Sequence, residues 1–505
     1  MELNLDRESC VPVYQQIARK IKERILSQKL TAGFKLPAER RLAEELGVHR
    51  NTVIKAYDVL IQEGLVVVSR NRPKGYFVEE LQEPQNFSKR FFPLEKAFRY
   101  EFRRAEKRFN DIYWKSEAAD VISFGGMIMD RNLDPVESAE KVTAKLFDSG
   151  AKDYMTRFAE ETQRLRENIC RILTRQNIYV TPKNVQLLAE SNQVISYLIT
   201  LYLREGDCVI AEEPMVPDNY SIFYNRGINI ITVPMEADGM RMDVLEECIR
   251  QYKPKFIYTQ PNYHNPTGIT MSLKKRRTLL RLADSYNIPI IEEDYLQDFS
   301  YTDQSLPSLY ALDANKLVIY VYSYTLIFPY LMKLSYAVGP PDFIDMLGYV
   351  LSVDETFVGS VGQYFLNEYI ESGAYDRHIK AVRQAYGARL DLLCGELDGI
   401  AEKGITYQRP EGGLLLWCAL AKDISERDLC RLAEEKGVII MPGWLFYTSE
   451  KKKTGHIRLC FSNVDEEEIR RGVGLLGEAL DQCRKRGLET READKKANGK
   501  EEETE

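Results

Sequence analysis

The sequence predicts an α/β protein with a small helical head followed by a large body built on a mostly parallel sheet. Strand-like runs alternate with helical runs between residues 120 and 483, a pattern typical of parallel sheets. At 505 residues the chain is too long for one ordinary core. Residues 1–78 carry 14 Lys and Arg against 9 Asp and Glu, a net of +5, whereas the whole chain carries -7. This contrast indicates a basic head on an acidic body.

The composition excludes several classes of protein. Nine scattered cysteines without a C-x-x-C pair are typical of reduced thiols in a cytoplasmic protein. Four histidines, none paired at ligand spacing, argue against a metal site. The N-terminus lacks an apolar signal region. The apolar stretch at 317–339 contains Pro329 and Lys333, so a buried strand and helix are expected there rather than a membrane span.

The head has the element order of a winged helix-turn-helix domain. Three helical segments and a pair of strands are predicted at residues 13–30, 36–48, 49–64 and 65–79. Ile17, Ile21 and Ile25 recur at helical spacing in the first segment. Gly47 and Gly64 end the second and third helices. Two helices, a turn, a third helix and a β-hairpin wing form a module that reads the major groove of DNA.

The residues expected to contact DNA are basic or polar and lie on the second helix, the third helix and the wing. They are Arg40, Arg50, Asn51, Thr52, Lys55, Arg70, Arg72 and Lys74. Such a module needs a helix N-terminus at the base edges and cations at the flanking phosphates. A solvated basic face on a small helical domain is the alternative for the same residues.

The run LPAERRLAEELGV, followed by RNTV, resembles the GntR-type winged helix. The resemblance covers about 70 residues of the chain. It implies that Arg40, Arg50, Thr52 and Gly75 occupy DNA-contacting or wing positions. His49 stands where the family often has a capping serine, so a weakened helix cap is expected.

Two segments outside these domains are also expected. Residues 79–119 are rich in basic and aromatic side chains and are predicted to link the head to the body. Docking of this linker on a partner subunit is favoured over nonspecific phosphate contacts, because a solvated linker seldom carries so many aromatic rings. The charged tail at 484–505 is predicted to be disordered, and the body spans 120–483.

Polar motifs follow several predicted strands of the body. QPNYHNPTG ends at Gly268, EEDYLQDF begins at Glu292, and GHIRLCFS surrounds Arg458. Parallel sheets bind ligands at the carboxyl ends of their strands. Each motif alone is commonly a turn, a helix start or an edge strand, and their combined order is what favours a site.

Together these motifs resemble the fold-type I aminotransferases, which use pyridoxal phosphate, over some 350 residues, and the whole chain resembles the MocR regulators. The resemblance implies that Asn265 contacts the pyridoxal 3′ oxygen and Tyr295 supplies the phenol. It places Glu293, with Asp294 adjacent, at the pyridine nitrogen. It matches Arg458 to the arginine that binds a substrate carboxylate.

Other family positions are changed. Ser323 matches a phosphate-binding residue, and Ser191 and Asn192 retain phosphate donors, but Glu190 replaces the glycine of that turn. Val216 replaces the aromatic ring that stacks on the cofactor, and Lys333 replaces a second substrate arginine. Leu326, or Thr325 in a second alignment, replaces the lysine that holds the cofactor. Without that lysine the cofactor loses its covalent anchor and the reaction loses its general base.

The sequence therefore predicts a DNA-binding regulator whose aminotransferase-like domain dimerises and senses a ligand, which is pyridoxal phosphate, an amino acid or a preformed adduct of the two. Two alternatives stay open: a working aminotransferase with an accessory DNA-binding head, and a body that serves only as a dimerisation scaffold. The family resemblance implies a homodimer bound to double-stranded operator DNA.

Overall fold

The computed structural model divides into two compact units, Met1–Arg99 and Tyr100–Glu505. It describes residues 5, 11–26, 29–69, 74–79, 104–118, 120–135, 138–142, 144, 154–302, 306–328, 332–354, 358–448 and 454–501. The wing residues Arg70 and Arg72 lie outside this described part.

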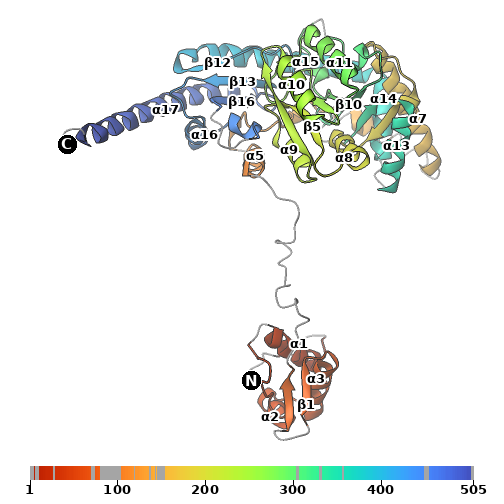
Figure 1. The fold of residues 1–505 in the computed structure, drawn as a ribbon, viewed down its shortest axis with the longest axis vertical. Helices are drawn as coiled ribbons and strands as arrows, with labels where there is room; N and C mark the ends of the chain where they lie inside the picture. The colour runs from red at the N-terminus through yellow and green to blue at the C-terminus, as the bar shows by residue number, and fades with distance from the viewer. Residues whose placement is uncertain are drawn as a thin grey trace. The chain divides into compact units, whose positions relative to one another are not determined.

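The described part of the head contains three helices and one hairpin (Figure 1). They are α1 (Val13–Leu26), α2 (Glu39–Leu46), α3 (Arg50–Gln62), β1 (Val66–Ser69) and β2 (Gly75–Val78). The two strands pair antiparallel, with Val66 opposite Val78. Ile17, Ile21 and Tyr57 are fully buried where α1 packs against α3. The predicted order of the winged helix-turn-helix is confirmed.

An eight-stranded sheet forms the centre of the body (Figure 1). Its order is β4-β11-β10-β9-β8-β5-β6-β7. The strands are β4 (Val185–Leu188), β5 (Cys208–Glu213), β6 (Asn229–Glu236), β7 (Gly239–Met240), β8 (Ile257–Thr259), β9 (Ile290–Glu293), β10 (Val318–Ser323) and β11 (Ser335–Val338). The run from β6 through β10 is parallel, and β4, β7 and β11 pair antiparallel. This confirms the predicted mostly parallel sheet.

Helices cover both faces of this sheet because its strands are apolar on both sides. The helices are α7 (Tyr154–Thr174), α8 (Ser191–Tyr202), α9 (Pro217–Tyr224), α10 (Met242–Tyr252), α11 (Leu273–Tyr286), α12 (Leu309–Leu312), α13 (Pro341–Val353) and α14 (Ser360–Glu371). Val209 and Ala211 of β5 belong to the cluster that contains Phe223 of α9, whereas Ile210 belongs to the cluster that contains Leu279 of α11. Successive side chains of a strand point to opposite faces, so one strand serves both cores.

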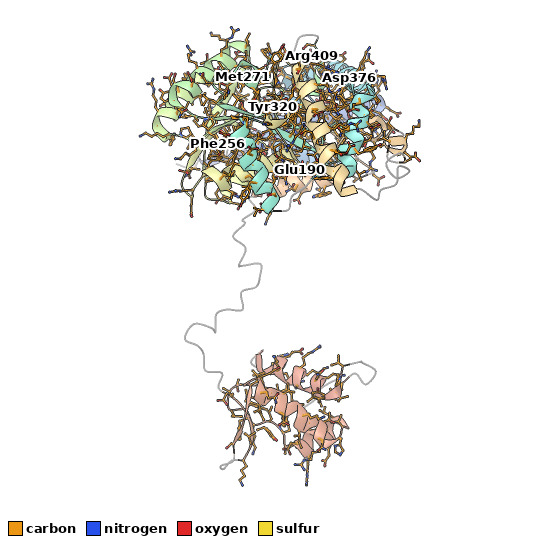
Figure 2. All side chains as sticks on the ribbon, turned by 90° about the vertical axis from the view of Figure 1, so that its right-hand side faces the viewer. Glu190, Phe256, Met271, Tyr320, Asp376 and Arg409 are labelled. Carbon is orange, nitrogen blue, oxygen red and sulfur yellow. The ribbon has the colours of Figure 1, made fainter. Side chains whose placement is uncertain are left out.

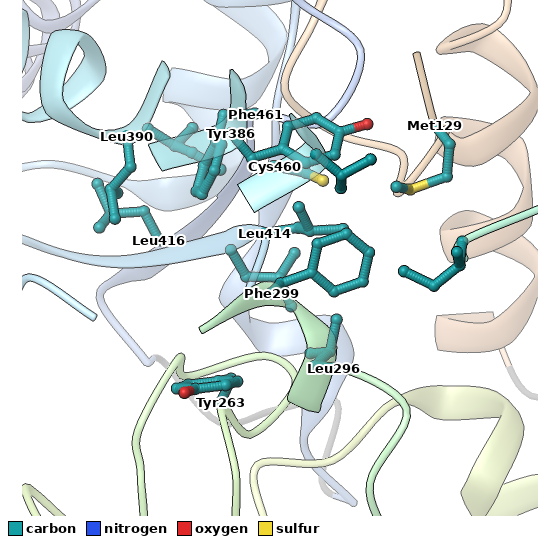
Figure 3. Packing of buried hydrophobic residues seen from close by; sticks show 14 of the residues in the cluster. Met129, Tyr263, Leu296, Phe299, Tyr386, Leu390, Leu414, Leu416, Cys460 and Phe461 are labelled. Atoms are coloured by element: carbon teal, nitrogen blue, oxygen red, sulfur yellow. The ribbon is translucent and has the colours of Figure 1, made fainter. Parts of the chain in front are cut away.

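A smaller C-terminal part adds an antiparallel sheet of order β12-β13-β16-β15. Its elements are α15 (Ala374–Asp398), β12 (Ile405–Tyr407), β13 (Leu415–Leu420), α16 (Glu426–Glu435), β14 (Val438–Ile439), β15 (Met441–Pro442), η6 (Gly443–Phe446), β16 (His456–Cys460) and α17 (Glu466–Glu501), and β14 pairs with β3 (Ile122–Ser123). Leu296 and Phe299, from the loop after β9, join Leu414 and Met129 in one core (Figure 3). This core fixes the small part against the large sheet.

The apolar stretch at 317–339 forms β10 and β11, and tyrosines of this stretch are buried in the body. Tyr320 is fully buried in the middle of the body (Figure 2), and the rings of Tyr322 and Tyr336 stack at 5.2 Å. Asp298 accepts hydrogen bonds from the hydroxyls of Tyr322 and Tyr375. In the part of the chain that the structure describes, no helix has the length and apolar character that crossing a bilayer requires.

The predicted linker ends inside the body. Helix α5 (Arg104–Lys115) buries Ala105, Phe109 and Ile112 against the segment that contains η6. These three residues lie on one helical face, at positions i, i+4 and i+7. The charged residues around them make this apolar pattern hard to recognise in the sequence. Helix α5, which lies within the predicted linker 79–119, therefore packs on its own chain, whereas docking of the linker on a partner subunit stays a prediction and residues 80–103 lie outside the described part.

The predicted disordered tail also needs correction. Helix α17 starts in the body and continues through Glu501, whereas disorder was expected from residue 484. Lys, Glu, Arg and Ala dominate this tail, it contains no proline, and all four favour helix. A helix already nucleated in the body extends at little cost.

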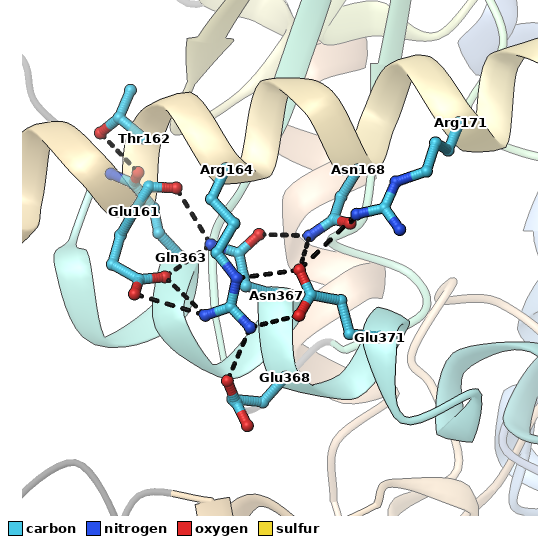
Figure 4. Close-up of polar contacts among 9 residues, drawn as sticks. All are labelled: Glu161, Thr162, Arg164, Asn168, Arg171, Gln363, Asn367, Glu368 and Glu371. Carbon is cyan, nitrogen blue, oxygen red and sulfur yellow. Dashed lines mark hydrogen bonds and ion pairs between the residues drawn. The ribbon is translucent and has the colours of Figure 1, made fainter.

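Polar side chains join α7 to α14 (Figure 4). Arg164 forms ion pairs with Glu161, Glu368 and Glu371, and hydrogen bonding to Glu371 raises the pKa of the guanidinium. Asn168 Nδ2 donates to Asn367 Oδ1 at 2.7 Å. This network fixes α7 on α14.

Candidate functional site

The recognition helix of the head is open to solvent at its N-terminus. Arg50, Asn51 and Lys55 of α3 are exposed, and Thr52 is half-buried. Arg50 Nη2 lies 3.3 Å from Glu39 Oε2, so a carboxylate of α2 orients this guanidinium. These predicted DNA contacts share one accessible end of α3.

His49 provides the cap of this helix. Its Nδ1 accepts a hydrogen bond from the backbone N–H of Asn51 at 3.2 Å. This requires a neutral imidazole with its proton on Nε2. The expectation of a weakened cap is corrected, because the imidazole performs the role of the serine hydroxyl.

The wing supplies the remaining described candidates. Lys74 is exposed at the start of β2, and Arg40 is exposed on α2. Gly75 has φ +151°, and a Cβ there would lie 2.8 Å from Cε of Lys35. The flexible Lys35 side chain could move away from such a Cβ, so it is the positive φ that favours glycine at residue 75.

The body contains a cavity of about 200 Å³ at the carboxyl ends of β9 and β10. Fourteen residues line it: Met127, Glu190, Ser191, Asn192, Val216, Asp218, Asn219, Gln260, Asn265, Glu293, Tyr295, Ser323, Thr325 and Leu326. The cavity thus brings together residues that lie up to about 200 positions apart in the sequence. This is the position where parallel sheets bind ligands.

Glu293 ends β9 and lines the cavity. Its Oε2 accepts from Gln260 Nε2 at 2.7 Å and from the Tyr258 hydroxyl. Asn219 Nδ2 in turn donates to that hydroxyl at 2.8 Å. A chain of amide and phenol donors thereby fixes the carboxylate.

Asp294 does not share this site, contrary to the expectation that placed it beside the cofactor. It accepts from Asn262 Nδ2 at 2.9 Å and from the Tyr320 hydroxyl at 3.2 Å, and it does not line the cavity. Burial raises the pKa of Asp294 well above its ordinary value. Consecutive side chains at a strand end point to opposite sides, which separates Asp294 from Glu293.

Asn265 connects the cavity to a buried arginine. Its Nδ2 donates to the Tyr295 hydroxyl at 3.0 Å, and its Oδ1 accepts from Arg458 Nη1 at 3.1 Å. Arg458 is only 1% exposed, and its Nη2 donates to the carbonyl of Gly125 at 2.7 Å. Burial lowers the pKa of Arg458. Asn265 and Tyr295 therefore lie at the cavity as predicted, whereas Arg458 lies behind it.

Two aromatic rings enclose that arginine. The guanidinium carbon of Arg458 lies 5.6 Å from the ring centre of Phe109 and 5.0 Å from that of Phe446. Cations over aromatic faces are attracted by the ring quadrupole. The helix that follows the linker thus contacts the predicted carboxylate-binding residue directly.

The end of the cavity near α8 carries a negative charge. Glu190 precedes α8, lines the cavity and pairs with Lys333 Nζ at 2.5 Å. Gln193 Oε1 accepts from the backbone N–H of Ala189 and of Glu190, at 2.9 and 3.2 Å. Lys333 is 67% exposed and does not line the cavity, so its predicted contact with a ligand carboxylate is replaced by this ion pair.

The position at which the family has its cofactor-binding lysine faces the cavity, but another residue stands there. Leu326 and Thr325, the two residues that the alignments allow, both line it. Ser323 Oγ donates to Thr325 Oγ1 at 3.0 Å and accepts from Ser335 Oγ at 2.9 Å. Within the described part of the chain, the lining residues include no Lys, Arg or His.

The family model described as "Aminotransferase class I and II" matches residues 130–476. The chain belongs to this family. The model described as "Bacterial regulatory proteins, gntR family" matches residues 13–78. The protein is a transcription regulator fused to an aminotransferase-like domain, in the arrangement of the MocR type.

Two relatives of this aminotransferase-family regulator match it over nearly its whole length, and a solved aminotransferase matches a smaller share. The "Uncharacterized HTH-type transcriptional regulator YisV" of Bacillus subtilis is 23% identical over 94% of this chain and 96% of its own length. The "Probable rhizopine catabolism regulatory protein MocR" of Rhizobium meliloti is 25% identical over 95% and 96%. The kynurenine aminotransferase of Pyrococcus horikoshii, solved in complex with PMP, is 26% identical, has a TM-score of 0.70, and is matched over 79% of this chain and 98% of its own.

The class I/II family and these structural neighbours depend on pyridoxal phosphate, but the cavity of this family member does not fit the cofactor in its usual mode. Glu293, Asn265 and Tyr295 would suit the ring side of the cofactor. Leu326 cannot form a covalent bond to it, and Glu190 would oppose its phosphate. Val216 offers no aromatic face for stacking.

Several residues of the site were not predicted. Gln260, Asn219 and Asp218 line the cavity, and Phe109 contacts the buried arginine. Gln260 directly follows β8, so its position at a strand end was the available signal. The other three come from segments whose approach to the sheet depends on the tertiary fold.

Proposed function

We propose that this transcription regulator uses its aminotransferase-like domain to bind a small effector without turning it over, and that two copies associate to present two heads to DNA. The observation that carries this proposal is the cavity itself. It keeps an ordered set of polar groups, yet Leu326 and Thr325 stand where catalysis requires an amine. A scaffold alone would have no need for the ordered donors that hold Glu293.

The contact between α5 and Arg458 supports regulation by a ligand. Helix α5 is the first described element of the unit Tyr100–Glu505, and its Phe109 packs edge-on against Phe446 at 5.8 Å. Arg458, held between these rings, is one hydrogen bond away from Asn265 in the cavity. A ligand that moves Asn265 would therefore change the surroundings of the helix that leads to the head.

An exposed apolar stripe supports association of two copies. Met346, Tyr349 and Val353 of α13 are 46%, 67% and 62% exposed and recur at i, i+3 and i+7. Apolar stripes of this kind commonly mark contact surfaces. A second copy of this chain is the occupant that two-fold DNA recognition requires, because paired half-sites call for paired heads. The proposed target, double-stranded DNA, implies action in the cytoplasm.

The test separates binding from turnover. The full chain is incubated with pyridoxal phosphate, reduced with borohydride and examined by mass spectrometry for a pyridoxyl group on any lysine. A related aminotransferase serves as the positive control. We expect no adduct, together with salt-sensitive binding of operator DNA in a mobility shift. A pyridoxyl-lysine adduct combined with amino-group transfer would replace this proposal with a working enzyme.

A further inference from the structure

The charged side chains that line the cavity are all acidic. Three carboxylates line it, those of Glu190, Asp218 and Glu293, whereas no cationic side chain is among its described lining residues. The remaining polar lining consists of amides and hydroxyls, which accommodate either sign of charge. The cavity therefore has the electrostatic character of a site for a cation.

Glu293 offers the most specific contact. The residue is 5% exposed, and Oε2 accepts both hydrogen bonds that the structure gives to this carboxylate. Oε1 receives no hydrogen bond from the described residues. Because Oε1 of this cavity-lining carboxylate has no donor among the described residues, it is an acceptor for a ligand N–H.

The opposite end of the cavity disfavours an anion. Glu190 sits before the first turn of α8, where backbone N–H groups and the helix dipole would otherwise attract a phosphate. Lys333 neutralises Glu190 from outside the cavity, so this pair leaves no positive charge facing inward. The uncompensated charges are those of Asp218 and Glu293.

We propose that this cavity binds a small organic cation, a primary amine whose ammonium group donates to Glu293 Oε1, in place of an anionic phosphate ester. This inference rests on the proposed function and specifies the chemistry of its effector. At about 200 Å³ the cavity is smaller than the ~300–1,000 Å³ of typical drug-sized sites, which suits a short aliphatic amine. Asp218 and the amide oxygens of the lining residues stabilise the same charge.

Calorimetry on the full chain tests the sign of the charge. Butylamine and 1,4-diaminobutane are the cationic probes, and inorganic phosphate and pyridoxal phosphate are the anionic probes. We expect saturable binding of the amines and none of the phosphates at matched ionic strength. Glu293→Gln keeps the shape of the side chain and should weaken amine binding tenfold or more, and Asp218→Asn, at an exposed residue, should weaken it by a smaller factor.

Glu247→Gln, an exposed carboxylate of α10 that does not line the cavity, is the matched control and should leave amine binding unchanged. Equal losses in Glu293→Gln and Glu247→Gln would show nonspecific ion pairing and overturn the inference. Saturable phosphate binding without amine binding would also overturn it. If pyridoxal phosphate then altered operator binding in a mobility shift, effector sensing would survive and only the cationic ligand would be wrong. If none of the probes bound, the cation inference would fail while DNA binding by the head could still be measured separately.

Discussion

Removing the ring of Phe109 should release α5 from the body. Phe109 is 7% exposed and packs against Phe446 with ring centres 5.8 Å apart and planes at 89°. Truncating a buried Phe to Ala typically costs about 3–5 kcal/mol of unfolding free energy. Loss of the edge-to-face pair and of the cation contact with Arg458 forms part of that total, at roughly 0.5–1.5 kcal/mol for the ring pair. We therefore expect Phe109→Ala to lower the free energy of unfolding of the body by about 3–5 kcal/mol.

Urea denaturation followed by circular dichroism measures this change. Trp114→Ala is the control, because Trp114 belongs to the same helix but is 66% exposed, and it should change the unfolding free energy by less than about 0.5 kcal/mol. Phe446→Ala and the double variant complete a cycle whose coupling should be about 0.5–1.5 kcal/mol. If Phe109→Ala were no more destabilising than Trp114→Ala, the docking of α5 on its own body would be refuted.

Three further predictions concern the head and one buried carboxyl. Arg50→Ala should abolish operator binding in a mobility shift while the circular dichroism of the head stays unchanged; retained sequence-specific binding would contradict the groove assignment. His49→Ala should destabilise the head by about 1 kcal/mol in a thermal melt, whereas His49→Ser, which restores a hydroxyl cap, should be close to neutral. Burial raises the pKa of Glu212 from 4.5 to about 7, so the folded body binds a proton between these values that the unfolded chain releases. The stability that Glu212 contributes is therefore present below about pH 4.5 and is lost as the pH rises through 7. Comparison with Glu212→Gln by denaturation at pH 5 and pH 8 should show this loss, and an identical pH dependence in both proteins would count against it.

Much of the fold follows from periodicity. Ile17, Ile21 and Ile25 share a helical face in the sequence and are buried together in the head. The strand at 318–323 was visible as an apolar run because its residues are buried on both faces. Local spacing determines such features, so sequence reasoning reaches them.

Only some of the residues that line the cavity could be predicted from the sequence. Glu293 ends a strand, Asn265 and Tyr295 follow strands, and strand ends are predictable. The period of two along β9 could also have separated Glu293 from Asp294, and that signal was missed. The placement of Ser191, Asn192 and Ser323 at the cavity agrees with the sequence expectation, although their binding of a ligand stays a prediction.

Contacts between segments that are far apart in the chain could not be predicted from the sequence. Lys333 and Glu190 are 143 positions apart, and no local pattern indicates that they pair. Phe109 and Arg458 meet because α5 packs on η6, which depends on the tertiary fold. The helical tail was misjudged for another reason: its high charge suggested disorder, whereas the same residue types favour helix when a nucleus precedes them.

The carboxylate of Glu190 has a consequence for competition at this site. A charged group that is covalently attached next to a binding site has an effective concentration of millimolar or more at that site. This concentration does not depend on the amount of free ligand. Any phosphate ester that enters from solution must displace this tethered anion and also separate it from Lys333. Under the proposed function, Glu190 would therefore act as an internal competitor against any phosphate ester that approaches the start of α8.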